Sequence, residues 1–192
     1  MSRQACAGPL PHAFQSPLPA AVPNAVGWPL ATNPARALAD YYLAARGGNA
    51  MLGRADFNPA ALKSILPRVF LLELRSEQEL YIRLGGTCLA SRAGRDLTGL
   101  DWLDLIAPAQ RAARGAAYLR MIDAQCGLRT VVRYPATLGD DIIAECLSLP
   151  LTPARADEPA LAVGVVASLR RPAGAKPMPF RQGIEEITAL PL

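Results

Sequence analysis

The sequence predicts an α+β protein built on an antiparallel sheet. Two alternating apolar runs, separated by a short polar break, lie between Leu66 and Gly86, which is the pattern of a β-hairpin. Three further apolar runs rich in β-branched residues follow over 128–137, 141–151 and 161–169. Helical patterns precede the hairpin and separate it from these runs. The expected order is two helices, two strands, several short helices, one longer helix and three strands.

The chain before the hairpin is expected to form a tail and a helical extension. Residues 1–32 contain six prolines and few charges, which predicts a flexible segment because proline removes the amide donors that a helix needs. Asn33 is the expected N-cap of the first helix, and Pro34 its first helical residue. A second, shorter helix is expected from Pro59 to Leu66. The apolar stripe of the first helix consists of Leu38, Tyr41, Tyr42 and Ala45.

The second strand of the hairpin has two distinct faces. Leu80, Ile82 and Leu84 share one face, and Tyr81 and Arg83 share the other. If the leucine face turns inward, Arg83 is a solvated residue. If the opposite face turns inward, Arg83 is a buried cation that needs a carboxylate or an anionic ligand.

The segment between the hairpin and the last three strands is expected to be helical but irregular. Gly94 and Gly99 divide residues 87–107 into pieces of one or two turns. Pro108 is expected to start the longest helix, and Gly127 to end it. The core stripe assigned to this helix consists of Ala112, Ala116, Leu119, Ile122 and Cys126.

Shifts in composition define the expected domain boundaries. Prolines return from Pro172 onward, and the segment RQGIEEITAL near the end is expected to form at most a weak helix. The expected parts are a flexible tail (1–32), an N-terminal helical extension (33–65), the folded domain (66–171) and a Pro-rich C-terminal tail (172–192).

Charge and motif content exclude several classes of function. The chain has 20 basic and 16 acidic residues without a run of five or more like charges, so a nucleic-acid partner is not expected. No stretch of 18 apolar residues occurs, and prolines interrupt the N-terminal region, so neither a membrane partner nor export is expected and the location is taken as cytoplasmic. The absence of a phosphate-binding glycine loop, a His-Glu-x-x-His pair and a Gly-x-Ser-x-Gly turn argues against an enzyme.

The order of elements resembles that of the PAS domain, in which several short helices and one longer helix interrupt a five-stranded antiparallel sheet after its second strand. The resemblance covers about Leu66 to Arg171. The segments LPRVFLLEL, YIRLGGTCLASRAGRDLTGLDWLDLIAP and LSLPL are similar to single-domain bacterial PAS proteins, which carry a helical lead like LADYYLAARGG. The resemblance implies a five-stranded PAS-like sheet with the short and longer helices on one face, and a sensory or regulatory module in signal transduction.

A PAS module without an attached output domain must act on a separate molecule, so an unidentified protein partner is expected. The apolar stripe of the first helix also leads us to expect a homodimer. Two interpretations of the first helix remain open at this point. Its stripe of Leu38, Tyr41, Tyr42 and Ala45 either covers the outer face of the sheet in one chain or also forms the dimer interface with a second copy.

The cofactors found in PAS modules can be compared with the residues that they need. Haem needs an axial ligand, and the single histidine, His12, lies in the N-terminal tail. Cys88 does not lie in the Asn-Cys-Arg-Phe-Leu-Gln motif of photoactive flavin domains. The cysteines show no Cys-x-x-Cys spacing that would indicate a metal site. No cofactor and no metal are therefore expected.

The PAS arrangement implies a ligand pocket between the inner sheet face and the cover formed by residues 87–106 and the longest helix. The apolar character of the expected lining favours a hydrophobic or amphipathic small molecule. A ligand-free protein-interaction adaptor is the alternative function, and an enzyme of unknown type is the disfavoured third. The expected ligand-binding residues are Ile82, Leu84, Cys88, Trp102 and Leu119, with Arg83 if it points inward.

Overall fold

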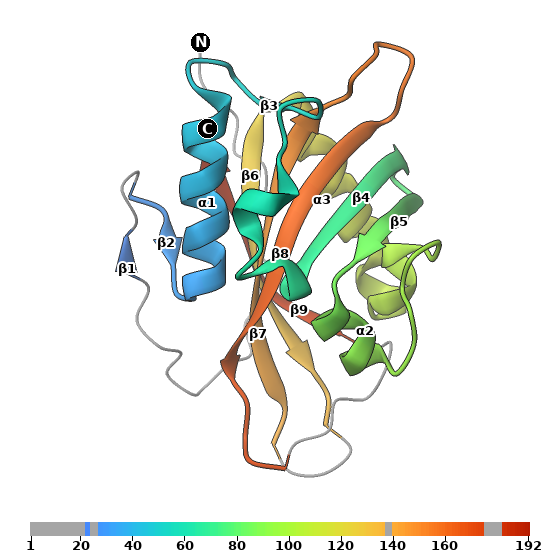
Figure 1. The fold of residues 1–192 in the computed structure, drawn as a ribbon. Coiled ribbons are helices and arrows are strands. Elements are labelled where there is room, and N and C mark those ends of the chain that lie inside the picture. Colours follow the sequence, from blue (N-terminus) through green and yellow to red (C-terminus); the bar gives the residue numbers. More distant parts are fainter. Residues whose placement is uncertain (1–21, 24–26, 137–139, 175–181) are drawn as a thin grey trace.

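The computed structural model of the chain describes residues 22–23, 27–136, 140–174 and 182–192. Its centre is a seven-stranded sheet of order β5-β4-β8-β7-β6-β9, in which β3 makes a short parallel pairing with β7 (Figure 1). The remaining pairings in this sheet are antiparallel, so the predicted α+β class is confirmed. The strands of the sheet are β3 (Leu52–Gly53), β4 (Val69–Ser76), β5 (Glu79–Gly85), β6 (Cys126–Tyr134), β7 (Ile142–Thr152), β8 (Ala160–Arg170) and β9 (Gly183–Pro191).

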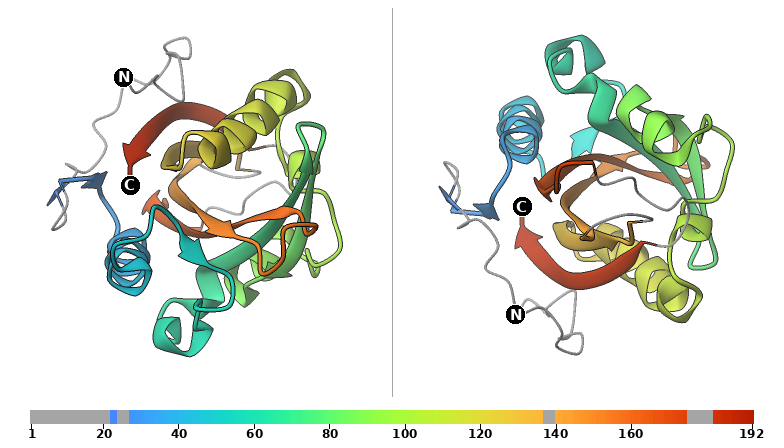
Figure 2. Two further views of the ribbon diagram at one scale, coloured as in Figure 1. Left: turned by 90° about the horizontal axis from the view of Figure 1, so that it is seen from above. Right: turned by 90° about the horizontal axis from the view of Figure 1, so that it is seen from below.

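Helices cover both faces of this curved sheet, and Figure 2 shows α3 and α1 on opposite sides of it. The face under α3 is called the inner face, and the face under α1 the outer face. The elements on the inner face are α2 (Thr87–Ala93), η3 (Trp102–Leu105), η4 (Pro108–Gln110) and α3 (Arg111–Asp123). The elements on or beside the outer face are α1 (Asn33–Arg46), η1 (Pro59–Leu62) and η2 (Leu66–Arg68), and a separate small pair is formed by β1 (Val22–Pro23) and β2 (Pro29–Leu30).

The predicted hairpin is β4 and β5, but an irregularity changes the direction of one of its side chains. Leu72 lies opposite Ile82 and Leu71 lies opposite Leu84, so Arg83 is an extra residue in β5. An extra residue reverses the alternation beyond it. Leu84 therefore shares the outer face with Leu71 and is 44% exposed, instead of following Ile82 into the inner core.

The side of α3 that faces the sheet differs from the predicted stripe. Ala112 is exposed, Leu119 is half-buried, and Cys126 lies outside the helix at the start of β6. The predicted stripe contained no arginine, whereas the helix presents the side of Arg114 to the sheet. The buried residues of α3 are Arg114, Gly115, Ala117, Tyr118 and Met121.

Helix α1 packs on the outer face and begins one residue earlier than predicted. Its N-cap is Thr32, whose hydroxyl oxygen accepts a hydrogen bond from the Ala35 amide, rather than Asn33. Ordered structure also extends into the segment expected to be flexible, because Trp28 and Leu30 are buried in the outer core. The expectation for residues 1–32 is thus wrong for 27–32, and the other residues of that tail, except the short strand β1, lie outside the described ranges.

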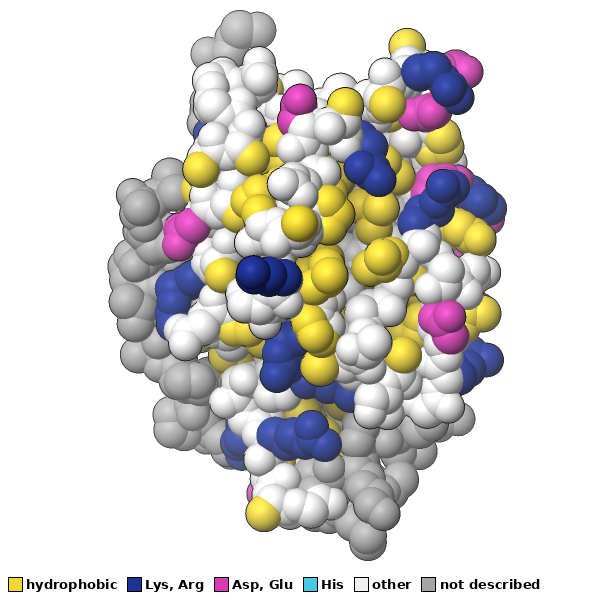
Figure 3. All heavy atoms as spheres, viewed as in Figure 1, with side chains coloured by type: hydrophobic (Ala, Val, Ile, Leu, Met, Phe, Trp, Pro, Cys, Tyr) yellow, Lys and Arg dark blue, Asp and Glu magenta, His cyan; other side chains and the backbone are white. Residues whose placement is uncertain are grey.

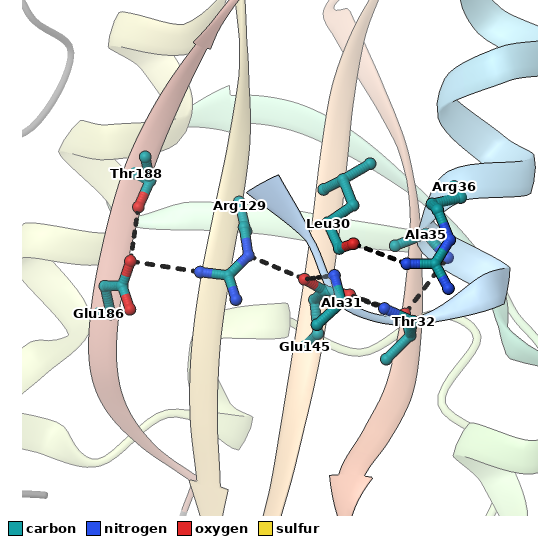
Figure 4. Close-up of polar contacts among 9 residues, drawn as sticks. All are labelled: Leu30, Ala31, Thr32, Ala35, Arg36, Arg129, Glu145, Glu186 and Thr188. Atoms are coloured by element: carbon teal, nitrogen blue, oxygen red, sulfur yellow. Dashed lines mark hydrogen bonds and ion pairs between the residues drawn. The ribbon is translucent and has the colours of Figure 1, made fainter. Parts of the chain in front are cut away.

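A buried ionic network holds this N-terminal segment on the sheet (Figure 4). The Glu145 carboxylate on β7 is fully buried and accepts hydrogen bonds from the amides of Ala31 and Thr32 and from the Thr32 hydroxyl, at 2.7–3.0 Å. On its other side it pairs with Arg129 of β6 at 2.8 Å, and Arg129 also reaches Glu186 of β9 at 3.2 Å. Three strands and the start of α1 are thereby linked across the outer face.

The C-terminal segment expected to be a weak helix is the strand β9. It pairs with β6 along its whole length, and its Ile184 lies opposite Val132 while Glu186 lies opposite Val131. The intervening Glu185 is an extra residue in β9. Because of it, Ile184 and Ile187 both face the inner core although they are three positions apart, a spacing that resembles that of a helix. The expected five-stranded sheet is consequently extended at its β6 edge.

Candidate functional site

A buried group of polar side chains lies on the inner face under α3. Arg114 and Tyr118 are one turn apart on the helix and point together toward the sheet, as i and i+4 residues do. The Arg114 guanidinium donates to the Thr130 hydroxyl and, at 3.3 Å, to the Tyr118 hydroxyl. Its Cζ lies 4.8 Å from the centre of the Tyr118 ring. The group, called here the inner polar cluster, consists of Arg114, Tyr118, Thr130, Cys146 and Ser148.

Three further contacts complete the inner polar cluster from β7. The Tyr118 and Ser148 hydroxyls are 2.9 Å apart, and the Cys146 sulfur lies 3.8 Å from both Ser148 Oγ and Arg114 Nη2. These residues alternate with outward-pointing neighbours along β7, which is why Cys146 and Ser148 share the inner face while Glu145 and Leu147 face outward.

The inner polar cluster contains a cation but no anion at neutral pH. Arg114 is 1% exposed and its guanidinium stays charged. Burial raises the pKa of the Tyr118 hydroxyl to about 12, and burial likewise raises the pKa of the Cys146 thiol. Both groups are therefore protonated and neutral. Thr130 and Ser148 are hydroxyls, so nothing within the cluster balances the charge of Arg114.

The rest of the chain does not supply the missing anion either. Among the described residues, Arg114 forms no ion pair with an aspartate or glutamate. The residues outside the described ranges contain no aspartate or glutamate at all. The nearby Glu145 lies on the opposite face of β7, where Arg129 and the Thr32 amide bind it.

Two buried hydrogen-bond donors on the inner face also lack acceptors within the described part of the chain. They are the Nε of Arg114 and the indole nitrogen of Trp102. The Trp102 ring stacks on Phe70 with centroids 4.5 Å apart, so the indole is held in place by the inner core. Buried donors without partners are uncommon in folded proteins and indicate either a cost to stability or a missing ligand.

The backbone of α3 lies unusually close to the hairpin turn. A Cβ atom at Gly115 would lie 1.8 Å from the Glu77 carbonyl oxygen, so only glycine permits this approach. The contact lies beside Arg114 in the sequence and fixes α3 against the end of the hairpin. The position of the guanidinium is thus determined by backbone packing as well as by its hydrogen bonds.

The predicted pocket residues separate into two groups. Ile82 and Trp102 are buried in the inner core, where Leu119 packs at the margin, and Cys88 on α2 is a half-buried free thiol. Leu84 lies on the outer face, so its assignment to the pocket is wrong.

Arg83, the conditional member of the predicted set, is also outside the inner core. Its guanidinium is largely exposed and pairs with the Glu73 carboxylate at 2.8 Å. The hydrogen bond from Arg75 is the main reason that the pKa of Glu73 lies below its usual range, with a smaller contribution from Arg83. Arg83 is therefore the solvated residue of the first interpretation.

The residues expected at a dimer interface are used within the chain. Leu38 and Tyr42 are fully buried against the outer face, and the Tyr42 hydroxyl donates to the Pro150 carbonyl at 2.6 Å. Tyr41 is half-buried against Phe57, and Ala45 is exposed. The homodimer remains a prediction, but its interface would have to use residues other than Leu38 and Tyr42.

The described residues form neither a metal-binding cluster nor a membrane-spanning helix. Within the described ranges, no three His, Cys, Asp or Glu side chains gather in a way that could hold a metal ion. His12 lies outside those ranges. The helices that the structure describes are all too short or too polar to cross a bilayer.

Comparison with known families agrees with the strand order and the helical cover of the inner face. The sequence model of the PAS domain family matches residues 30–167, which is more than two thirds of the chain. The chain belongs to the PAS domain family. The match includes α1. No curated protein matches the chain significantly.

PAS domains in general are sensory or regulatory modules, and the family is typically non-enzymatic. In this PAS domain the sequence reading missed Arg114, Tyr118, Thr130 and Ser148. One signal could have identified the helical pair: an arginine and a tyrosine at i and i+4 lie among the small residues Ala112, Ala113, Gly115, Ala116 and Ala117.

Proposed function

We propose that this PAS domain is a sensory module whose signal is a small amphipathic acid bound on the inner face of the sheet, with its anionic head on Arg114. The observation that carries the proposal is the buried guanidinium without a counter-ion. Desolvating such a charge costs several kcal/mol, and hydroxyl partners offset only part of that cost. A carboxylate is the group that a guanidinium binds best, through two parallel hydrogen bonds.

The surroundings of the inner polar cluster favour an apolar remainder of the ligand. Tyr118 and Cys146 belong to the inner core, which also contains Met121, Leu128 and Val132. The indole N–H of Trp102 offers a second donor for a polar group. This chemistry refines the expected amphipathic ligand by giving it an acidic head.

The cover of the inner face provides a route of entry. Between β5 and α3 it consists of α2, η3 and η4, which are short elements of three to seven residues. Short elements with few contacts open locally at low free-energy cost. A ligand that holds this cover closed would change the surface that the module presents to a partner protein. In this proposal the module transmits its signal by binding and does not catalyse a reaction.

A ligand series tests the proposal directly. Purified protein is first stripped of bound molecules by reversible denaturation, and its thermal unfolding is then followed with decanoate and with decanol. Decanoate is expected to raise the unfolding temperature saturably, and decanol is not, because only the carboxylate pairs with Arg114. Arg114→Met should abolish the effect of decanoate. Arg120→Met is the matched control, because Arg120 lies on the exposed side of the same helix.

The ligand-free adaptor is the competing function, and the same experiment separates the two. If neither compound stabilises the protein, and native mass spectra of freshly purified protein show no bound mass, the inner core is filled and the sensory proposal is wrong. Stabilisation by decanoate that survives Arg114→Met would place the acid elsewhere and would likewise contradict it.

A further inference from the structure

A second basic site lies at the surface, away from the inner polar cluster. It is an open groove of about 510 Å³ between the start of α1, η2, α2 and the end of β8. In Figure 3, Lys and Arg side chains gather over the lower part of the face shown, without Asp or Glu side chains between them. The residues that give the groove its chemistry are Thr32, Asn33, Arg68, Arg92, Ser168 and Arg171.

Three guanidinium groups line this groove and have no carboxylate partners. None of the lining residues is acidic. Within the described ranges, Arg68, Arg92 and Arg171 take part in no ion pair, and the undescribed residues contain no aspartate or glutamate. Elsewhere on this PAS domain the surface arginines Arg83 and Arg155 are paired with carboxylates.

Arg92 is held in a fixed orientation by neutral groups. Its Nη2 donates to the Ser168 hydroxyl at 2.8 Å, and its Cζ lies 5.9 Å from the centre of the Tyr134 ring. Its Nη1 is buried and has no hydrogen-bond partner among the described residues. One N–H edge of this positioned guanidinium is therefore left without a hydrogen-bond partner among the described residues.

The start of α1 contributes less than the arginines. The N-terminus of a helix carries partial positive charge. Here the Glu145 carboxylate already accepts the amides of Ala31 and Thr32, which offsets most of that charge. The attraction for an anion comes mainly from Arg68, Arg92 and Arg171.

We propose that this groove binds the phosphate group of a small molecule. Three guanidinium groups suit a dianionic phosphate better than a single carboxylate, because guanidinium forks match phosphate oxygens and the charges add. The volume of the groove falls within the range of small-molecule pockets, roughly 300–1,000 Å³. The basic residues surround one bounded hollow rather than forming an extended track, which favours a small phosphorylated molecule over an acidic peptide.

Isothermal titration with inorganic pyrophosphate, at constant ionic strength, tests this proposal. Saturable binding is expected, and Arg68→Gln and Arg171→Gln should each weaken it about tenfold, the effect of losing one charge-assisted hydrogen bond. The control Arg155→Gln removes the same charge from a distant exposed site and should change affinity by less than about twofold. Unchanged unfolding temperatures establish that the variants are folded.

Three results would overturn the proposal. The first is the lack of saturable binding, and the second is an equal loss in Arg155→Gln, which would indicate an effect of net charge alone. The third is tighter binding of a hexaglutamate peptide than of pyrophosphate with the same sensitivity to Arg68→Gln, which would make the groove a protein-docking surface. Arg114→Met should leave pyrophosphate binding unchanged, so the two anion sites are tested independently.

Discussion

Replacing Glu145 by glutamine should destabilise the protein more than any other conservative change on the outer face. The substitution keeps the size of the side chain but removes its charge and replaces one acceptor oxygen by an NH₂ donor. In the native network both carboxylate oxygens accept hydrogen bonds, from Ala31, Thr32 and Arg129 (Figure 4). The amide would place a donor against donors and leave Arg129 without its closest counter-ion.

The size of the effect follows from burial. Glu145 is fully buried and the Arg129 side chain is 8% exposed, and removing one member of a buried pair costs about 3–5 kcal/mol. Glu186 keeps a contact with Arg129 at 3.2 Å, which moves the expected loss to the lower end, about 3 kcal/mol. This is a large part of the stability of a typical domain, about 5–15 kcal/mol.

Urea denaturation followed by circular dichroism measures this loss. The midpoint for Glu145→Gln should fall by roughly 1–2 M, for a slope of about 2 kcal/mol/M. Glu186→Gln is the control, because Glu186 belongs to the same network but is half exposed, and it should cost less than about 1 kcal/mol. Equal losses in the two variants would show that the buried pair contributes no more than a surface pair, and the reasoning would fail.

Three further predictions concern the interior. In ligand-free protein, Arg114→Met should leave the free energy of unfolding unchanged or raise it by up to about 2 kcal/mol, because the hydroxyl partners offset only part of the desolvation cost of the charge; a loss above about 3 kcal/mol in urea denaturation would mean that the fold itself balances the charge. Tyr118 has a pKa of about 12 in the folded state, whereas a free tyrosine has one near 10. The contribution of protonated Tyr118 to the free energy of unfolding is therefore fully present below pH 10 and should fall by roughly 3 kcal/mol toward pH 12. Burial also raises the pKa of Tyr134 to about 12, so Tyr118→Phe should reduce this decline in denaturation curves taken across that range without removing it, and an unchanged decline would refute the prediction. Gly164→Ala would place a Cβ 2.1 Å from the Phe70 ring and should cost at least about 3 kcal/mol or prevent folding. The control Gly48→Ala has no atom near its new Cβ and should change the free energy of unfolding by less than about 1 kcal/mol. Urea denaturation measures both variants.

The strands could be predicted where alternation is regular, and β-bulges explain where prediction failed. β-branched runs correctly located β6, β7 and β8. In β5 and β9, single extra residues at Arg83 and Glu185 shift the alternation by one position. The first shift moved Leu84 out of the expected pocket, and the second gave a strand the spacing of a helix. A bulge depends on the partner strand, so a single strand's sequence does not reveal it.

The candidate site was missed for a different physical reason. A rule that places arginine in solvent is correct for most positions, and it assigned Arg114 to the outside of α3. The rule fails where the sheet offers Arg114 a hydroxyl partner, Thr130, which lies 16 positions away in the sequence. The neighbouring Tyr118 meets the Ser148 hydroxyl across 30 positions. Only the assembled fold brings these groups together, whereas the apolar members Ile82 and Trp102 could be assigned to the interior from the sequence.

The contact between Trp28 and Pro191 joins the two ends of the described chain. The indole N–H donates to the Pro191 carbonyl at 3.1 Å across 163 sequence positions, and Trp28, Leu30 and Leu190 share the outer core. Detachment of β9 would remove the acceptor of Trp28 and part of its apolar cover at the same time. The segment before α1 and the last strand therefore form one cooperative unit, and their amide protons should exchange with solvent deuterium together.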